Sequence, residues 1–408
     1  MDTETTVHPD EETLKAQCFE IGTELGSSLE ELLREIGGTR SRTGEFAKVL
    51  GIDKVLASRA LKTARAGDPL AILHVAPGPD PLRRIVQAAD SKGAPKAVVD
   101  RTRKAVSRFE RLIRENAGDR SGLTTLLSAW LPEARREFEL RRKQSAYRAM
   151  SEIRGSSAET TLATVLLHPS ESPGFLDVVW LFGVIRLRRT RPGAQIRLTS
   201  RRVANTGSPR RPMTLDRERV DDLRGLRLTE FCSTPPVGID VHDTGEVVHY
   251  TVARDLELLS EVDLVFAEVN LAEIEDTLKP GATRSAYFFS EISIPTRQSL
   301  FDVLVHEDVY RTIAPRLLIY DTAFEGIASV NDRSRDLDVL DLDESLEAMG
   351  TGVDHLRTSA VPRYAAILDS VFHSLGWDAG RFRGYRSRID FPIYGTQITI
   401  SFDPPVSR

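Results

Sequence analysis

The stretch TGEFAKVLGIDKVLASRALKTA, residues 43–64, decides how the first third of the chain is interpreted. Its apolar residues recur at helical spacing on both sides of a glycine: Phe46, Ala47, Leu50, Ala57, Ala60 and Leu61. Gly51 stands where the chain must reverse, and glycine alone adopts positive φ there without steric cost. Asp53 is a good N-cap for a following helix. The stretch therefore predicts two short helices joined by a tight turn.

The outer face of the second helix is polar and cationic. It carries Lys54, Val55, Ser58, Arg59 and Lys62. This is the layout of a DNA-reading helix-turn-helix, in which the second helix enters the major groove. An ordinary helical hairpin inside a bundle is the alternative interpretation.

The same residues resemble a known family. The segments Glu45–Lys48, Leu50–Ile52 and Ser58–Leu61 are similar to the helix-turn-helix of bacterial repressors of the lac-repressor type, over residues 43–64 of the 408. The resemblance implies that the early residues of the second helix and its Ser-Arg pair touch DNA. The expected DNA-binding set is Arg42, Thr43, Lys54, Val55, Ser58, Arg59 and Lys62.

The net charge of −5 conceals a strong asymmetry along the chain. Residues 1–39 hold 2 Lys+Arg against 10 Asp+Glu, whereas residues 40–150 hold 24 against 12. The remainder is acidic again, with 29 against 38. A basic block around the motif is the electrostatic footprint of a polyanion binder, because neutralising phosphates releases counterions. Solvated helix faces would give the same composition.

Composition sets further limits on the class of protein. Cys18 and Cys232 are the only cysteines, which excludes a disulfide framework and a cysteine-based zinc site. No run of 18 or more apolar residues occurs, and the acidic N-terminus is no signal peptide. We therefore expect a cytoplasmic protein without a membrane partner.

The pattern predicts several domains. An acidic helical segment over residues 1–39 precedes a basic helical region over 40–155, and an α+β, sheet-rich domain over 160–408 senses, oligomerises or recruits. Short runs rich in Val, Ile, Leu and Thr predict its strands, and Leu300–Ala314 and Pro362–Leu375 its clearest helices. The small, polar residues near Gly155 predict a protease-sensitive linker.

A second basic patch occurs in the C-terminal domain, at Arg186, Arg188, Arg189, Arg197, Arg201 and Arg202. Arg191–Ala194 is a plausible hairpin turn between two of its strands. The patch predicts either a second polyanion-binding surface or a ribbon paired with acidic surface elsewhere, such as the run 336–347.

No catalytic constellation stands out. Phosphate-binding, dinucleotide-binding and hydrolase motifs are missing, and the scattered histidines lack helix-spaced metal ligands, so we expect no cofactor and no metal. The sequence favours a bacterial transcriptional regulator that binds double-stranded DNA as a homodimer or higher homo-oligomer, with an unknown effector or protein partner possible. Two alternatives stay open. One is an assembly protein that docks a partner through Val55 and Leu56, and the other is an enzyme in the C-terminal domain.

Overall fold

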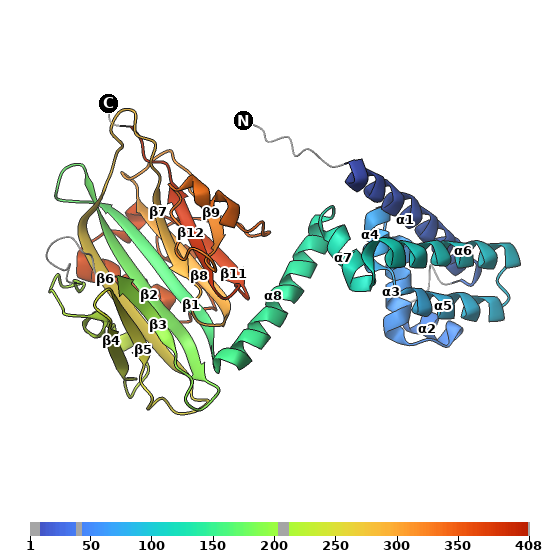
Figure 1. The fold of residues 1–408 in the computed structure, drawn as a ribbon, viewed down its shortest axis with the longest axis horizontal. Coiled ribbons are helices and arrows are strands. Elements are labelled where there is room, and N and C mark those ends of the chain that lie inside the picture. Colours follow the sequence, from blue (N-terminus) through green and yellow to red (C-terminus); the bar gives the residue numbers. More distant parts are fainter. Residues whose placement is uncertain (1–8, 38–42, 203–211, 407–408) are drawn as a thin grey trace. The chain divides into compact units, whose positions relative to one another are not determined.

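The chain forms two compact units, residues 1–139 and 140–408. The computed structural model describes residues 9–37, 43–202 and 212–406. The first unit is helical and the second is built mainly of strands (Figure 1). A helical N-terminal region followed by a mixed, sheet-rich region is thus confirmed.

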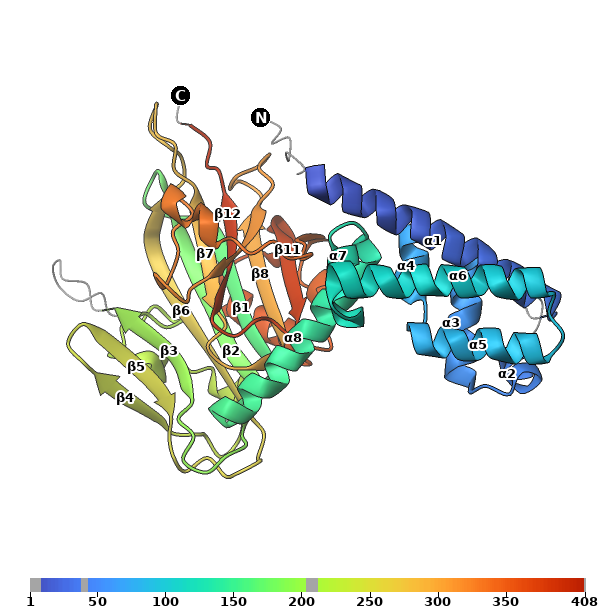
Figure 2. The ribbon, with the colours of Figure 1, turned by 45° about the vertical axis from the view of Figure 1, so that its right-hand side comes forward.

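The helical unit consists of short helices packed around α1 (Figure 2). Its elements are α1 (Pro9–Glu35), α2 (Thr43–Leu50), α3 (Lys54–Arg65), α4 (Pro69–Val75), α5 (Pro79–Ser91), α6 (Lys96–Leu112), the π-turn η1 (Ile113–Ala117) and α7 (Arg120–Ser128). The helix α8 (Pro132–Arg154) contains the division between the two units. Among the described residues, no helix is both long and apolar enough to cross a membrane.

The acidic helix α1 belongs to the core of this unit. Its Leu25, Leu29, Leu32 and Leu33 are fully buried in one cluster with residues of α2 to α7. The part of the expected segment 1–39 that forms α1 therefore does not stand apart. The acidic side chains from Glu12 to Glu35 instead line one side of this helix, whose other side is apolar.

The expected linker near Gly155 is part of the second unit. Gly155 ends α8 with a φ of 66°, and its carbonyl oxygen accepts the Thr190 N–H at 2.9 Å. Ser156 directly opens β1 (Ser156–Pro169) and pairs with Arg189 on β2 (Phe175–Arg189). Because the backbone here is hydrogen-bonded, we no longer expect preferential cleavage at this point.

A six-stranded sheet organises the second unit. Its strand order is β10-β11-β8-β1-β2-β6, and β1 and β8 pair in parallel while the other neighbours are antiparallel. The remaining strands of this sheet are β6 (Val262–Glu275), β8 (Thr296–His306), β10 (Glu347–Thr351) and β11 (Phe382–Asp390). Two three-stranded sheets accompany it, β7-β12-β9 and β3-β5-β4.

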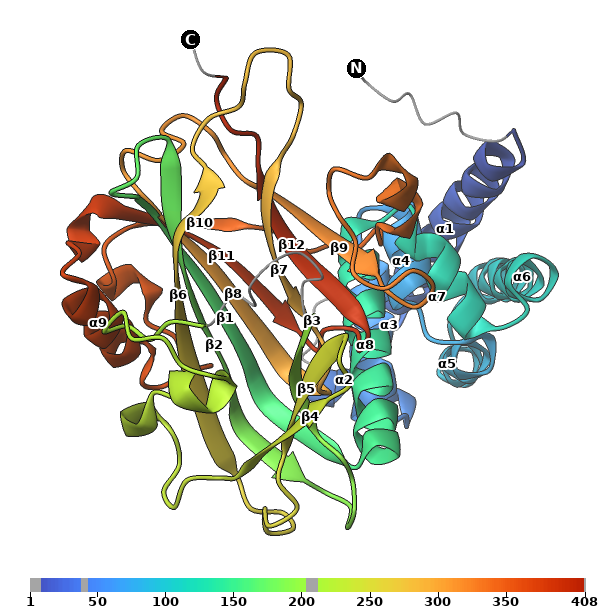
Figure 3. The ribbon, with the colours of Figure 1, turned by 60° about the vertical axis from the view of Figure 1, so that its left-hand side comes forward.

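Each face of the large sheet is covered by a different layer (Figure 3). Leu162 and Leu166 of β1 pack with the helix α9 (Tyr364–Leu375). The alternating residues Ala163 and Val165 pack against the sheet of β7 (Ala286–Glu291), β9 (Arg316–Asp321) and β12 (Thr396–Phe402). Because successive side chains of a strand point to opposite faces, β1 contributes to both cores.

The helix expected over Leu300–Ala314 is wrong, because Leu300–His306 lies in the central strand β8 and the residues after it form turns. Leu300 and Leu304 face the α9 side, whereas Phe301 and Val303 face the smaller sheet. A strand buried on both faces reads as a continuous apolar run, which periodicity alone cannot distinguish from a helix. The helix expected over Pro362–Leu375 is confirmed as α9.

The expected hairpin around Arg191–Ala194 is also wrong. The turn exists, with Gly193 at a φ of 73°, but the flanking strands belong to different sheets. The strand β2 pairs with β1 and β6, whereas β3 (Arg197–Arg202) pairs with β5 (Val247–Val252), which in turn pairs with β4 (Ile239–Asp243).

A buried ion pair joins β8, β11 and α9. The Asp302 carboxylate is fully buried and accepts two hydrogen bonds from Arg386, at 2.9 and 2.6 Å, and one from the Tyr364 hydroxyl at 2.7 Å. Arg386 also donates to the Leu356 carbonyl at 2.8 Å. Each partner therefore satisfies the charge of the other inside the α9 side of the sheet.

Candidate nucleic-acid interface

The turn between α2 and α3 has the geometry expected from the sequence. Gly51 adopts a left-handed conformation with a φ of 66°, and the following Ile52 N–H donates to the Ala47 carbonyl at 3.1 Å. The Asp53 side chain then accepts the Leu56 N–H at 2.8 Å and caps the start of α3. The turn glycine and the aspartate cap are thus confirmed, and together they fix the direction in which α3 leaves α2.

One side of α3 is buried and the other is exposed. Leu56, Ala57, Ala60 and Leu61 lie in the core, Ala57 and Ala60 with no exposed surface. The opposite stripe consists of Val55, Ser58, Arg59 and Lys62, at a spacing of i, i+3, i+4 and i+7, with Lys54 beside it. Ser58 is half-buried, and the others are exposed.

The structure brings most of the expected site residues onto one surface. Val55 is the most exposed of the apolar side chains in this stretch, at 71%. Thr43 is half-buried at the start of α2, and Arg42 lies outside the described residues. Leu56, expected as a docking contact in the assembly alternative, is only 6% exposed and is part of the core.

The cations of α3 are not neutralised as those of α6 are. The helix α3 carries Lys54, Arg59, Lys62 and Arg65 and no acidic residue. Within the described part of the chain, Lys54 and Lys62 form no ion pair, and neither does Lys48 on α2. The positive charge of α2 and α3 is therefore available to a ligand.

On α6, by contrast, acidic partners face the arginines. Arg101 pairs with Glu31 of α1 at 2.5 Å, and Arg108 pairs with Glu20 and Glu24 of α1 at 2.8 and 2.5 Å. Arg103, also on α6, pairs with Asp90 and Asp100. These arginines of the basic region therefore form ion pairs that stabilise the helical unit.

Arg59 has a second contact that sequence reasoning missed. Its guanidinium donates to the Ala76 carbonyl, just past the end of α4, at 2.9 Å. Arg120 donates to the carbonyls of Leu73, His74 and Ala76 at the same helix end. Burial, and then the nearby charge of Arg59, lower the pKa of Arg120 to about 10. Arg59 therefore also contributes to packing α3 against α4.

The second basic patch proves to be largely paired or buried. Arg189 is 4% exposed and donates to the carbonyls of Ala253, Arg254 and Leu256. Arg186 and Arg188 lie 3.9 and 3.6 Å from Glu261.

The remaining arginines of the patch lie on β3. Arg201 pairs with Glu268 at 3.2 Å, and Arg197 is exposed on the same strand. The side chain of Arg202 lies outside the described residues. The paired-ribbon interpretation fits this geometry, but the acidic partners are Glu261 and Glu268 and not the run 336–347.

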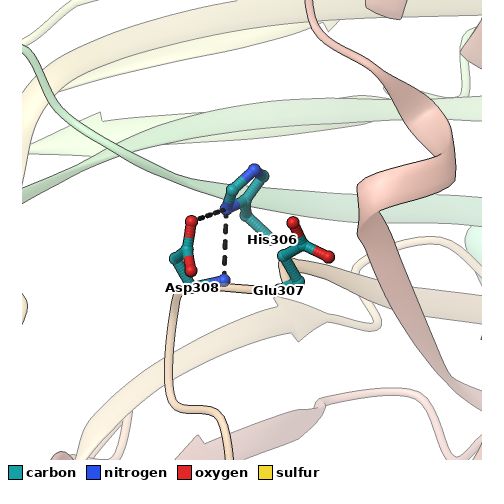
Figure 4. A group of neighbouring side chains, drawn as sticks. All are labelled: His306, Glu307 and Asp308. Carbon is teal, nitrogen blue, oxygen red and sulfur yellow. Dashed lines mark hydrogen bonds and ion pairs between the residues drawn. The ribbon is translucent and has the colours of Figure 1, made fainter.

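A histidine and two acids gather at the end of β8 (Figure 4). Ligand atoms of His306, Glu307 and Asp308 lie within 4.8 Å of one another. However, His306 Nδ1 accepts the Asp308 backbone N–H at 3.2 Å, and Arg381 pairs with Glu307 and Asp308 at 2.6 and 3.1 Å. The group is an ion-paired turn, in which protein contacts engage His306 Nδ1 and both carboxylates.

The same histidine belongs to an aromatic cluster at the end of the large sheet. The His168 ring stacks on Trp377 with centroids 4.3 Å apart and meets the His306 ring edge-on at 4.8 Å. Phe382 contacts both histidines. Burial lowers the pKa of both His168 and His306, so that both rings are neutral at pH 7.

A pocket of about 350 Å³ lies where β1 and β8 begin. Its charged groups have partners: Glu159 lies 3.7 Å from Arg297, Asp390 accepts a hydrogen bond from Gln298 at 2.7 Å, and Arg186 lies 3.9 Å from Glu261 outside the pocket. The pocket offers no nucleophile activated by a base, so it gives no support to the enzyme alternative.

Comparison with known proteins gives no family. No family model and no curated protein matches the chain. A solved structure of a putative protease from Parabacteroides distasonis is similar at a TM-score of 0.26 and 8% identity, over 62% of this chain and 41% of that chain. A likeness this weak carries no argument about function.

Proposed function

We propose that the protein is a sequence-specific DNA-binding protein, of the kind found among bacterial transcriptional regulators, in which α3 of a helix-turn-helix enters the major groove. The observation that carries this proposal is the outer face of α3, whose Lys54 and Lys62 are exposed and form no ion pair among the described residues. When such cations bind DNA phosphates, condensed counterions are released, and this release contributes to the binding affinity.

The residues of the stripe suit different parts of the duplex. Lys54 and Lys62 reach phosphates, Ser58 and Arg59 reach base edges, and the exposed Val55 suits contact with a thymine methyl group. To reach a base edge, the Arg59 guanidinium must release or share its hydrogen bond to the Ala76 carbonyl. Its replacement by alanine should therefore weaken both DNA binding and the packing of α4.

The proposal is tested by the salt dependence of binding to a random-sequence duplex, measured by fluorescence anisotropy with the full chain. Replacing Lys54 and Lys62 together by alanine should reduce the slope of log affinity against log salt by about 1.8, or about 0.9 per phosphate contact. Between about 50 and 200 mM salt this is a difference of about 12-fold. The matched control is Lys104→Ala, which removes an exposed lysine of α6 that forms no ion pair among the described residues.

An unchanged slope in the double variant, or an equal change in Lys104→Ala, would overturn the assignment of α3. The assembly alternative predicts no duplex binding that depends on Lys54 and Lys62, and it requires a protein partner instead. Val49 and Val55 are 45% and 71% exposed on α2 and α3, a feature that favours protein docking. Such an interface buries apolar surface and is not weakened by moderate salt.

A further inference from the structure

The carbonyl oxygen of Ala76, just past the end of α4, accepts hydrogen bonds from two arginines. Arg59 of α3 donates to it from Nη2 at 2.9 Å, and Arg120 of α7 donates from its own Nη2 at 3.2 Å. Ala76 is fully buried. A buried carbonyl needs a donor, because leaving it unpaired carries the full cost of its desolvation. With two donors on this oxygen, one can leave without that cost.

The two arginines differ in how firmly they are held. Arg120 also donates to the carbonyls of Leu73 and His74, at 2.6 and 2.7 Å. Its guanidinium lies 5.6 Å from the centre of the buried Phe109 ring. The Arg59 side chain, in contrast, forms no hydrogen bond within the described part of the chain except the one to the shared carbonyl. Arg59 is therefore the donor that can move, and Arg120 is the donor that stays.

Like charge favours the departure of Arg59. Two cationic guanidiniums approach the same oxygen, and the charge of Arg59 contributes, after burial, to the low pKa of Arg120. When Arg59 leaves for a duplex, this repulsion is relieved. Nη1 of Arg120 is also buried and has no hydrogen-bond partner among the described residues. The guanidinium that stays therefore has more N–H donors than it uses.

We propose that Arg120 is a positioning residue for DNA binding, which keeps the Ala76 carbonyl satisfied while Arg59 exchanges its bond to that carbonyl for one to the duplex. This inference rests on the proposed function, since it concerns how Arg59 becomes available to a base edge. A donor that leaves no unpaired group behind reaches the base at a lower cost in free energy. Without Arg120, the same movement leaves a buried carbonyl unpaired, and Arg59 stays on the protein.

The experiment is a double-mutant cycle on the full chain. The wild-type chain first selects a duplex from a random-sequence library, and the affinity of each variant for this duplex is measured by fluorescence anisotropy. In the wild-type background Arg59→Ala should weaken binding by about 5- to 150-fold, the value of a base contact. In the Arg120→Met background the same change should weaken it by about threefold or less. There, breaking the bond to Ala76 costs about as much as the base contact returns.

The effect on stability should change in the opposite sense. Arg59→Ala alone leaves Ala76 bonded to Arg120, so the urea midpoint should shift only slightly. In the Arg120→Met background the carbonyl loses both donors, and Arg59→Ala should shift the midpoint further. A residue that merely supports the fold would not reduce the effect of Arg59→Ala on binding while increasing its effect on stability. The matched control background is Arg111→Met, which removes an exposed arginine of α6 that forms no ion pair among the described residues and should leave both effects unchanged.

A second measurement does not depend on the folding of Arg120→Met. NMR of the wild-type chain with isotope-labelled arginine records the side-chain Nε–H signal of Arg59, which Arg59→Lys assigns. This signal should shift when the selected duplex binds. An equal Arg59→Ala loss in the wild-type and Arg120→Met backgrounds, or an Arg59 signal that the bound duplex leaves unchanged, overturns this inference alone, provided that the salt slope still depends on Lys54 and Lys62. The absence of a selected duplex and of that slope overturns the DNA-binding proposal and this inference with it.

Discussion

Substituting Gly51 by alanine should lower the free energy of unfolding of the helical unit by about 1–2 kcal/mol. The cost comes from the backbone, since Gly51 has a φ of 66°, where an L-residue brings its Cβ too close to the following carbonyl. A Cβ at this position would meet no neighbouring atom within 4 Å, so steric contact with the rest of the unit adds nothing. Valine, which is β-branched, should cost more, up to about 3 kcal/mol.

Gly44, in the helix α2 that precedes the turn, provides a control of opposite sign. It lies in α2 without positive φ, and the nearest atom to an added Cβ is Lys54 Cε at 3.9 Å. Gly44→Ala should therefore stabilise the unit by a few tenths to about 1 kcal/mol, because alanine loses less backbone entropy in a helix. Gly51→Asn should lie close to the wild type, since asparagine tolerates the left-handed region.

The assay is urea unfolding of the full chain followed by far-UV circular dichroism, which reports mainly on the helical unit. The reasoning is refuted if Gly51→Ala unfolds with the wild type, or if Gly44→Ala and Gly51→Ala shift the midpoint in the same direction. If asparagine and valine at position 51 lower the free energy of unfolding equally, then steric space, and not backbone conformation, determines which residues the turn accepts.

Two further predictions concern the second unit. In the folded protein His168 and His306 have pKa values below the ordinary value of about 6.5, so below that pH the unfolded chain binds more protons than the folded chain. The free energy of unfolding should therefore be highest above about pH 6.5 and decrease as the pH falls. His168→Phe should make this pH dependence weaker in urea titrations. Asp302→Ala leaves the Arg386 guanidinium buried without its carboxylate and should cost about 3–5 kcal/mol, whereas Asp302→Leu with Arg386→Met should recover much of that loss in the same measurement.

Local features of the fold could be predicted from the sequence, because they depend on residues a few positions apart. The turn at Gly51 and the cap at Asp53 are of this kind, and so is α9, whose apolar spacing is helical. The strand β8 could not be recognised, since both its faces are buried and its apolar run has no alternation. The partner of β3 lies about fifty residues away on β5, and no local pattern specifies that pairing.

In the candidate interface, too, the sequence alone does not show which charged residues are paired. Counting residues identifies a basic block but cannot tell which cations are neutralised, because their partners are distant in sequence: Arg101 and Arg108 meet acids of α1, 70 to 88 residues away. Lys54 and Lys62 are set apart from them only by folding, which places α3 with its cationic stripe outward. It also follows that removing residues 1–39 would not simply unmask positive charge. It would expose the core that Leu25, Leu29 and their neighbours fill and so unfold the helical unit, so a deletion cannot isolate the electrostatic effect of these acidic residues on DNA binding.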